Sequence, residues 1–218
     1  MTRKTGLLGG TFNPPHHGHT RPAREAMKAL GLERVVCIPT GMHPFKGPER
    51  LAPVSHRVAM VRLLLERETG FSLWEIEANA PRVSYTVETL EAWHALFPDQ
   101  EPVLLIGGDI PRELHLWRAW RRILELAHVC LMERPGFVES DHTRCPALTH
   151  LEEHAVNNPE DLERERLGRY GFFRLAVSPE DLSSTELRRQ LSQGDIPRGA
   201  TADAVIDYAL AHGLYRAG

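Results

Sequence analysis

Short apolar runs alternate with helix-length stretches along most of this chain, and this alternation is the strongest constraint on its fold. In residues 54–68, for example, Val58, Val61 and Leu64 recur at the spacing of one helix face. Apolar strands separated by helices predict βαβ units, and therefore an α/β, Rossmann-like doubly wound, mostly parallel sheet with helices on both faces. The expected strands are residues 5–9, 34–39, 71–76, 103–107, 128–132 and 172–177, and the expected helices are residues 20–30, 54–68, 86–97, 117–126, 185–191 and 201–211.

The loop after the first expected strand carries an unusual group of glycines and histidines. Residues 9–19 read Gly-Gly-Thr-Phe-Asn-Pro-Pro-His-His-Gly-His, and a helical stretch follows. Glycines let backbone N–H groups approach a phosphate, and a helix N-terminus adds partial positive charge at the same place. His16 and His19 are three residues apart, so they share one face of a first helical turn. The string therefore suits a transferring phosphate better than the alternative, a strand–turn–helix corner with two solvated histidines.

A second anion site is expected at a helix start near the C-terminus. Residues 182–188 read Leu-Ser-Ser-Thr-Glu-Leu-Arg, which places three hydroxyls at the helix start and an arginine one turn later. Ser183 and Glu186 have the spacing of a capping box. Taken alone, this segment also fits a helix cap with a surface arginine.

Two further loops follow expected strands. Asp109 comes just after the fourth strand and its glycines, so its carboxylate can accept hydrogen bonds from ribose hydroxyls, although it can also cap the next helix. The Gly/Pro loop at residues 39–46 carries His43 and Lys46, and a lysine is a mobile charge that can fold over bound phosphates. An ordinary surface loop with a solvated lysine is the alternative. The three sharpest motifs all begin at or just beyond a strand end, where doubly wound sheets bind ligands.

Residues 135–167 differ from the rest because they are polar and rich in charge. We expect surface loops and a solvated helix in this insert. It contains His142, Cys145, His150 and His154, and the last two have metal-ligand spacing. Because no carboxylate–histidine grouping of catalytic spacing accompanies them, we interpret them as solvated histidines and expect no metal site.

Composition argues against several classes of function. The 218 residues carry a formal net charge of −3, so there is no basic footprint for nucleic acid. No apolar run reaches the roughly 18 residues of a membrane span, and glycines and prolines interrupt any signal-peptide pattern. The three cysteines lack C-x-x-C spacing, and Cys37 and Cys130 lie in apolar runs typical of buried thiols. We expect a cytoplasmic enzyme with no nucleic-acid partner and no membrane partner.

Several segments together resemble a known family. Residues 9–19 resemble the nucleotidyltransferase superfamily of the T/HxGH type, and residues 182–188 are similar to its ISSTxIR segment, with Leu182 for the usual isoleucine. Residues 106–109 are similar to its GxD element. Residues 84–90 resemble an SYTxxTL helix start, and Trp117 resembles a ring-stacking aromatic. With the chain length and the closing Gly213-Leu214-Tyr215-Arg216, the resemblance is to the bacterial nicotinate-mononucleotide adenylyltransferase family, nearly end to end.

This resemblance implies that ATP and nicotinate mononucleotide react to give nicotinate adenine dinucleotide and pyrophosphate. The mononucleotide phosphate attacks the α-phosphorus in line, without a covalent intermediate, and Mg²⁺ is carried with ATP. The matching family loop commonly reads Pro-Pro-His-Lys, which residues 43–46 reorder, so Lys46 carries over better than His43. The implied catalytic residues are His16, His19, Lys46 and Arg188; the implied ATP-binding residues are Gly9, Gly10, Thr11, Phe12, Gly18, Gly107, Asp109, Ser183, Ser184 and Thr185; and the implied mononucleotide-binding residues are Asn13, Tyr85, Thr86, Trp117 and Arg134.

Other interpretations stay open at this stage. The same chemistry could use nicotinamide mononucleotide or another phosphate acceptor such as phosphopantetheine, and a catalytically silent nucleotide-binding regulator is a rival of a different class. The chain has neither a P-loop nor a G-x-G-x-x-G fingerprint, which argues against a P-loop NTPase and a typical dinucleotide-binding dehydrogenase. We expect a single nucleotidyltransferase domain over residues 1–218, with a small helical portion from about residue 182. The sequence does not decide whether the protein is a homo-oligomer.

Overall fold

The computed structural model describes residues 3–42, 51–108, 110, 113–133, 145–163 and 170–216. Lys46, Asp109 and Arg134 lie outside these residues, as do His43 and His142, so their expected roles stay predictions. Within the described ranges, no helix combines the length and the apolar character needed to cross a membrane.

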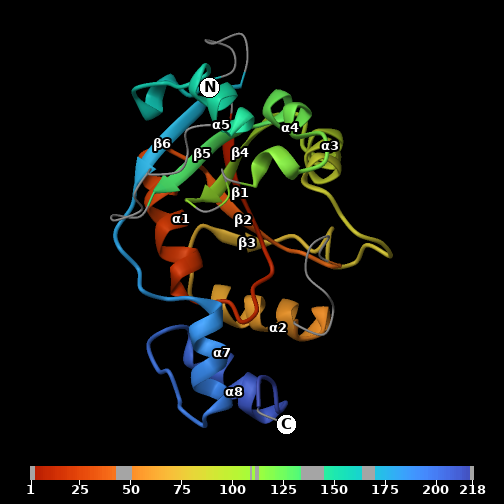
Figure 1. Cartoon of the computed structure of the whole chain (residues 1–218), viewed down its shortest axis with the longest axis vertical. Helices are drawn as coiled ribbons and strands as arrows, with labels where there is room; N and C mark the ends of the chain where they lie inside the picture. Colours follow the sequence, from red (N-terminus) through yellow and green to blue (C-terminus); the bar gives the residue numbers. More distant parts are fainter. Residues whose placement is uncertain are drawn as a thin grey trace. The chain divides into compact units, whose positions relative to one another are not determined.

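Six strands form one sheet in the order β3-β2-β1-β4-β5-β6 (Figure 1). β1 pairs with β4, β4 with β5 and β5 with β6, all in parallel. The order runs outward in both directions from β1 and β4, which is the doubly wound arrangement predicted from the sequence. The strands are β1 (Arg3–Gly10), β2 (Arg34–Pro39), β3 (Phe71–Leu73), β4 (Gln100–Gly107), β5 (His128–Glu133) and β6 (Phe172–Ala176).

The helices also follow the sequence prediction, with shifts at their ends. The first begins three residues before the predicted start, so that it includes residues 17–19 of the glycine–histidine string. The fourth begins three residues later than predicted, because a short 3-10 turn, η3 (Leu114–Leu116), precedes it. The α-helices are α1 (His17–Ala29), α2 (Val54–Leu65), α3 (Thr86–Leu96), α4 (Trp120–Leu126), α5 (Pro146–Glu152), α7 (Ser184–Ser192) and α8 (Asp203–Ala211).

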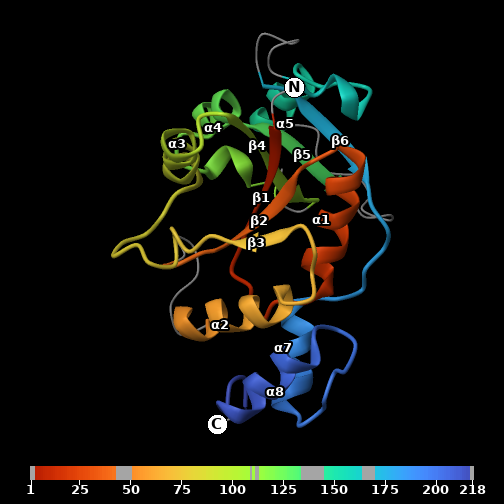
Figure 2. The same ribbon diagram turned by 180° about the vertical axis from the view of Figure 1, so that it is seen from behind.

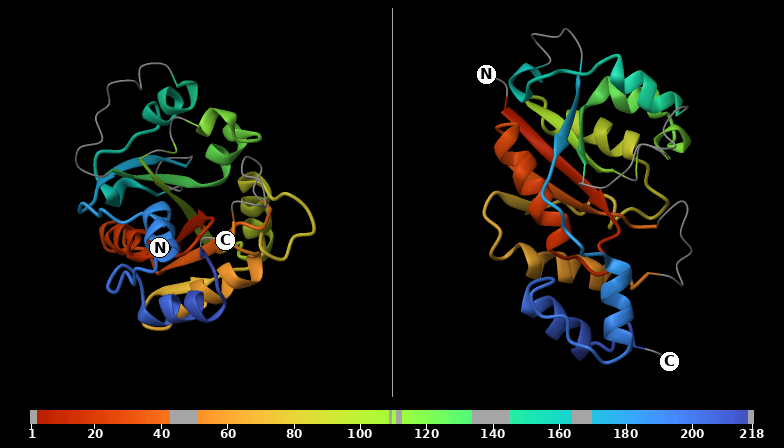
Figure 3. Two further views of the ribbon diagram at one scale, coloured as in Figure 1. Left: turned by 60° about the horizontal axis from the view of Figure 1, so that its bottom comes forward. Right: turned by 60° about the vertical axis from the view of Figure 1, so that its left-hand side comes forward.

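The chain divides into two compact units, which are described separately. The first unit comprises Met1–Leu8, Pro22–Val35 and Tyr85–Pro179. Its central strand is deeply buried: Val103, Leu104, Leu105 and Ile106 of β4 are each at most 5% exposed. Because right-handed crossovers leave β1 and β4 in opposite directions, helices α1 (red) and α4 (green) lie on opposite faces of the strands (Figure 3), as predicted.

The second unit comprises Gly9–Arg21, Val36–Ser84 and Glu180–Gly218. Its helical part has a core of its own, in which Met60 and Leu64 of α2 pack against Val205 and Ala209 of α8. Figures 2 and 3 show α2 beside the C-terminal helices α7 and α8. These C-terminal helices therefore belong to the same compact unit as the glycine–histidine string. The predicted single domain over residues 1–218 stays a prediction.

Two buried cysteines confirm the expectation for thiols in apolar runs. Cys37 and Cys130 are about 1% and 0% exposed, and burial raises the pKa of each thiol to about 12. Both are therefore un-ionised near neutral pH, and neither can serve as a nucleophile there.

The insert differs from its prediction. Helix α5 is not a solvated helix, because Ala147, Leu148 and Leu151 are at most 7% exposed, and Leu162 beyond it is fully buried. Because charged residues dominate the insert, sequence analysis did not identify the short apolar stripe of α5. The burial of this stripe depends on distant parts of the chain. The predicted strand at residues 71–76 is also shorter, since β3 ends at Leu73.

Candidate active site

The loop after β1 is held in a fixed, largely buried conformation. Phe12 has a positive φ of 47° and is 1% exposed, so its ring fills the interior of the second unit. Helix α1 then begins at His17, whose N–H donates to the carbonyl of Ala200 at 2.9 Å. The N–H of His19 donates to the carbonyl of His16 at 2.9 Å, which closes the first turn. The predicted helix N-terminus is therefore present, and the histidines lie on it.

His16 and His19 lie against each other, as their spacing predicts. Their ring centroids are 3.9 Å apart, and Nδ1 of His19 lies 3.2 Å from both the backbone N and the carbonyl O of His16. The ring of Phe12 contacts His19 on another side, at a centroid distance of 4.9 Å. His16 is only 4% exposed. The two imidazoles are thus preorganised by the protein rather than by a ligand.

Gly18 explains why a glycine stands between these histidines. A Cβ built at this position would lie 2.8 Å from Nδ1 of His16 and 3.1 Å from the carbonyl oxygen of Leu182. Any larger residue would therefore displace the His16 ring or separate this loop from the segment before α7. At Gly9, by contrast, a Cβ would meet no protein atom within 4 Å.

The start of α7 contacts the same loop. Ser183 is the N-cap, and its hydroxyl oxygen accepts from the N–H of Glu186 at 3.1 Å, as the capping box predicts. Ser184 donates from its hydroxyl to the carbonyl of Pro14 at 2.9 Å, and Arg188 donates to the carbonyl of Asn13 at 2.7 Å. Two motifs about 170 residues apart in the sequence are therefore brought together. We call residues 13–19 and 183–188 the α1–α7 corner.

Asn13 lies at the centre of this corner. It is 1% exposed, and its side-chain oxygen accepts from the N–H of Ala52 at 3.0 Å and from the hydroxyl of Tyr215 at 2.9 Å. Burial raises the pKa of Tyr215, although the nearby Arg188 and Arg57 charges act in the opposite direction. Sequence analysis assigned no role to Tyr215 itself. The signal was the closing Gly-Leu-Tyr-Arg, which was noted only as part of the resemblance.

Arg57 is a second residue that sequence reasoning missed. Its side chain is buried, and it donates to three backbone carbonyls: Ala52 from Nε at 3.0 Å, Thr11 from Nη1 at 2.8 Å and Gly41 from Nη2 at 3.1 Å. Burial lowers the pKa of the Arg57 guanidinium from its usual value. Arg57 thus ties the loops after β1 and β2 to the start of α2. The sequence did contain a signal for this burial. Arg57 lies four residues before Val61 and seven before Leu64, so it shares their apolar helix face.

One acidic residue beside the corner, Glu68, contacts the start of α1. Glu68 lies 3.7 Å from Nδ1 of His17 and accepts from the hydroxyl of Thr20 at 3.3 Å. The pKa of His17 is lowered, first by burial and then by the charge of Arg21, against the opposing effect of Glu68. Among the described residues, only one group of three or more metal-ligating side chains occurs, and it is not in this corner. The donor set here is imidazole, hydroxyl, guanidinium and helix N-terminus, which suits an anion.

The residues expected to bind the mononucleotide ring lie mostly in the first unit. Tyr85 is the N-cap of α3 and Thr86 its first residue, and the guanidinium of Arg118 lies 4.8 Å from the centre of the Tyr85 ring. Arg118 also pairs with Glu88 at 3.4 Å. Trp117, the residue before Arg118, is half-buried in an extended conformation after η3. Helices α3 and α4, side by side in Figures 1 and 2, therefore bring these segments together.

The other residues predicted to bind ATP lie at the ends of strands or at the start of α7. Gly107 ends β4 and is partly exposed. Gly9 and Gly10 end β1 in the second unit, and the carbonyl of Gly10 accepts from the N–H of Thr40 at 2.9 Å. The hydroxyl of Thr185 accepts from Arg188 at 3.2 Å. No ligand contact of any of these residues is tested, so their roles stay predictions.

Comparison with known proteins places the chain among nucleotidyltransferases. A model of the "Cytidylyltransferase-like" family matches residues 7–190. A "Probable nicotinate-nucleotide adenylyltransferase" of Shewanella sp. strain ANA-3 is 34% identical over 215 residues, which cover 97% of this chain and 99% of that protein. The protein with the same description from strain MR-7 is 35% identical over 217 residues, with the same coverage.

A solved structure shares the fold. The Plasmodium falciparum nicotinic acid mononucleotide adenylyltransferase complexed with NaAD matches with a TM-score of 0.72 at 15% identity, over 98% of this chain and 97% of that one. At this identity, the likeness speaks for the fold alone. The doubly wound α/β architecture is thereby confirmed from a second direction.

Proposed function

Because this chain belongs to the cytidylyltransferase-like family, and relatives matched over nearly its full length are described as probable nicotinate-nucleotide adenylyltransferases, we propose that it joins ATP and nicotinate mononucleotide. The products are nicotinate adenine dinucleotide and pyrophosphate, and the reaction is a step of NAD biosynthesis. The protein is thus a nucleotidyltransferase. The chemistry requires one phosphate to attack another, and therefore two anions held close together.

The observation that carries this proposal is the α1–α7 corner. It places two imidazoles in contact at a helix N-terminus, beside a second helix N-terminus with hydroxyls and Arg188. Each of these groups favours an anion, and together they suit a polyphosphate better than a single carboxylate. Bare backbone at Gly9, where a side chain would meet open space, supports the same role because a phosphate can approach there.

The mechanism follows from these positions. The mononucleotide phosphate attacks the α-phosphorus of ATP in line, and the bond to the bridging oxygen of pyrophosphate breaks. No covalent enzyme intermediate is needed, so the protein contributes by positioning and by stabilising charge. We assign His16 and His19 to the α- and β-phosphates, where they donate hydrogen bonds as negative charge builds on the bridging oxygen.

The leaving group is assigned to the cationic residues. Arg188 neutralises pyrophosphate with help from the hydroxyls of Ser184 and Thr185, and Lys46 approaches from its loop. Among the described residues of the corner, no group of three metal-ligating side chains occurs. We assign Mg²⁺ to the ATP phosphates, which carry it with them.

Recognition of the two nucleosides is assigned to the remaining residues. Gly107 and Asp109 contact the adenosine ribose, with Gly10, Thr11 and Phe12 on the phosphate side. Tyr85, Thr86 and Trp117 hold the pyridine ring, with Asn13 and Arg134 near its ribose phosphate. The half-buried position of Trp117 supports a stacking role, since its side chain is neither fully packed in the core nor fully exposed.

The acid form of the acceptor is the proposed substrate. Backbone N–H groups near the start of α3 and after Trp117 satisfy a carboxylate, but they would face the NH₂ group of the amide donor to donor. Each unpaired group costs about 1–3 kcal/mol, so two such mismatches give a preference of tens-fold or more.

The test is pyrophosphate release from ATP and Mg²⁺, with kcat/KM measured for nicotinate mononucleotide, nicotinamide mononucleotide and phosphopantetheine. The acid should be preferred. Equal values for acid and amide would overturn the substrate assignment but leave adenylyl transfer intact. No release with any acceptor would show a silent regulator instead. We place the enzyme in the cytoplasm, and its oligomeric state is open.

A further inference from the structure

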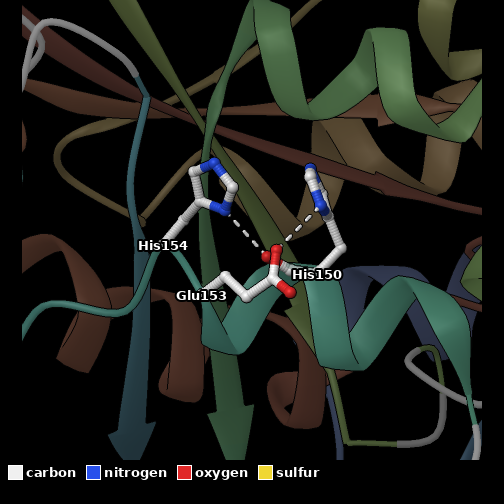
Figure 4. A group of neighbouring side chains, drawn as sticks. All are labelled: His150, Glu153 and His154. Atoms are coloured by element: carbon white, nitrogen blue, oxygen red, sulfur yellow. Dashed lines mark hydrogen bonds and ion pairs between the residues drawn. The ribbon is translucent and has the colours of Figure 1, made fainter.

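A compact cluster of three side chains lies at the end of α5, in the first unit. One ring nitrogen each from His150 and His154 and a carboxylate oxygen of Glu153 all lie within 4.8 Å of one another. Figure 4 shows both imidazoles on the same side of the helix end, with the Glu153 carboxylate between them. None of these residues belongs to the predicted active site. Their sequence, His-Leu-Glu-Glu-His, places all three on one turn.

The spacing within the cluster is close to that of a metal site. Nδ1 of His150 lies 3.5 Å from a carboxylate oxygen of Glu153. Two ligand atoms bound tetrahedrally to one zinc ion at about 2.0–2.2 Å lie about 3.3–3.5 Å apart, so this pair needs almost no movement. The Glu153 side chain is 65% exposed and can turn towards an ion.

Both imidazoles are held in place by other groups. Nδ1 of His154 lies 2.8 Å from the carbonyl oxygen of His150. A carbonyl can only accept, so this nitrogen carries the hydrogen and Nε2 is left as the basic one. In Figure 4, Nε2 lies on the side of the ring away from Glu153, so the His154 ring must turn to bring Nε2 to an ion. The ring of His150 packs edge-on against Trp120 at a centroid distance of 5.8 Å, and this fixed ring lowers the entropy lost when a metal binds.

The electrostatic surroundings favour a cation. The cluster lies at the C-terminal end of α5, where the helix dipole attracts positive charge. The neighbouring cation, Arg174, pairs with Glu133 and Glu152. On the inner side, His150 and His154 border apolar residues that include Leu124 and Val129, which exclude water from one side of the rings.

From these observations we propose that His150, Glu153 and His154 form a binding site for a divalent transition-metal ion of the zinc class. Two imidazoles and one carboxylate are ligands that Zn²⁺ prefers, and water completes the coordination. The site is independent of the Mg²⁺ carried by ATP, because Mg²⁺ prefers oxygen ligands.

The position of His154 gives the ion a structural role. Its carbonyl accepts from the N–H of Phe172 at 2.9 Å, and Ala155 forms a parallel bridge with Phe172, the first residue of β6. An ion bound to His150 and His154 therefore ties the end of α5 to strand β6. Because the folded site binds the ion more tightly than the unfolded chain, zinc should stabilise the first unit.

The test is a calorimetric titration of zinc chloride into the full chain, stripped of metal and free of nucleotide. We expect one ion per chain with a Kd on the order of 1 μM, and a rise in the midpoint of thermal unfolding. A Kd weaker than about 100 μM would overturn the proposal.

Variants locate the ion. His150→Gln and His154→Gln should each weaken binding at least about 10-fold, and the double variant should abolish this site. Glu153→Gln should weaken binding, whereas Glu160→Gln, the same change at an exposed glutamate outside the cluster, should not. His212→Gln is the control for loss of an exposed histidine. Metal-free circular dichroism shows whether each variant is folded. If the double variant still binds one ion with the original affinity, the ion lies elsewhere and the proposal is wrong.

Discussion

Two histidine pairs in this protein have almost the same local sequence spacing but opposite surroundings. His16 and His19 are three residues apart at the start of α1, with ring centroids 3.9 Å apart. His150 and His154 are four residues apart at the end of α5, with ring centroids 4.6 Å apart. The first pair lies at a helix N-terminus near hydroxyls and an arginine. The second lies at a helix C-terminus near a glutamate.

This difference shows that the neighbours of an imidazole, rather than the imidazole itself, decide whether the site favours an anion or a cation. A neutral imidazole offers one donor and one acceptor, so it can serve an anion or a cation. The N-terminal dipole of α1 and the guanidinium of Arg188 favour phosphate. The C-terminal dipole of α5 and the carboxylate of Glu153 favour a metal ion.

The largest effect expected from this comparison is on turnover. His19→Ala removes a preorganised donor to the developing charge and should lower kcat by about 10²–10³-fold. His154→Ala, the same change in the other pair, should leave kcat within about two-fold because that pair does not contact the nucleotides. Steady-state pyrophosphate release measures both. A folded His19→Ala enzyme with near-normal turnover would show that the first histidine pair is not catalytic.

The next effect is on the stability of the frame around the first pair. Arg57→Met leaves three backbone carbonyls without their guanidinium donors and should lower the free energy of unfolding by about 3 kcal/mol. Arg62→Met, on the exposed side of the same helix, should lower it by no more than about 0.5 kcal/mol. Urea unfolding gives both values. Equal effects would show that the three contacts of Arg57 contribute little.

A third effect separates the two substrates. Arg188→Ala should raise the KM for ATP about 10–100-fold, the loss of a charge-assisted hydrogen bond worth about 1.5–3 kcal/mol, with a smaller change for the acceptor. Arg189→Ala is the matched control, because Arg189 is exposed and pairs with Glu186 on the outer side of α7. If the KM for the acceptor rises instead, the corner faces the mononucleotide rather than ATP.

The smallest effect concerns the hydrogen bond from Tyr215 to Asn13. Tyr215→Phe should lower the free energy of unfolding by about 0.5–1.5 kcal/mol and reduce kcat/KM slightly, because Asn13 is part of the corner. Tyr208→Phe also removes one hydroxyl, which lies 3.0 Å from Nδ1 of His56, but its kcat/KM should not change. An equal loss of activity in both variants would mean that Tyr215 acts only through stability.

Patterns confined to one segment were predicted well. The strands β1, β4, β5 and β6 follow from continuous apolar runs, and the Ser183 cap follows from its spacing to Glu186. The contact between His16 and His19 follows from helix geometry. Such features depend on residues within one turn or one strand, so their physics is present in the local sequence.

Features that depend on distant partners were not predicted. Arg57 looks like an ordinary helix arginine until the carbonyls of Thr11 and Gly41 surround it. The buried stripe of α5 was interpreted as part of a solvated helix because the insert is rich in charge. Burial depends on which surface the chain folds against, and a local window does not contain that surface.

The sequence by itself therefore determined the doubly wound α/β class, the order of its elements and the two motifs that suit a polyphosphate. Only the tertiary structure brought Ser184 and Arg188 onto the loop of Pro14 and Asn13, and only it showed why Gly18 cannot carry a side chain. The physical reason is one of range. Helix and strand propensity act over a few residues, whereas the field that makes one histidine pair suit an anion and the other a cation is assembled by folding from distant segments.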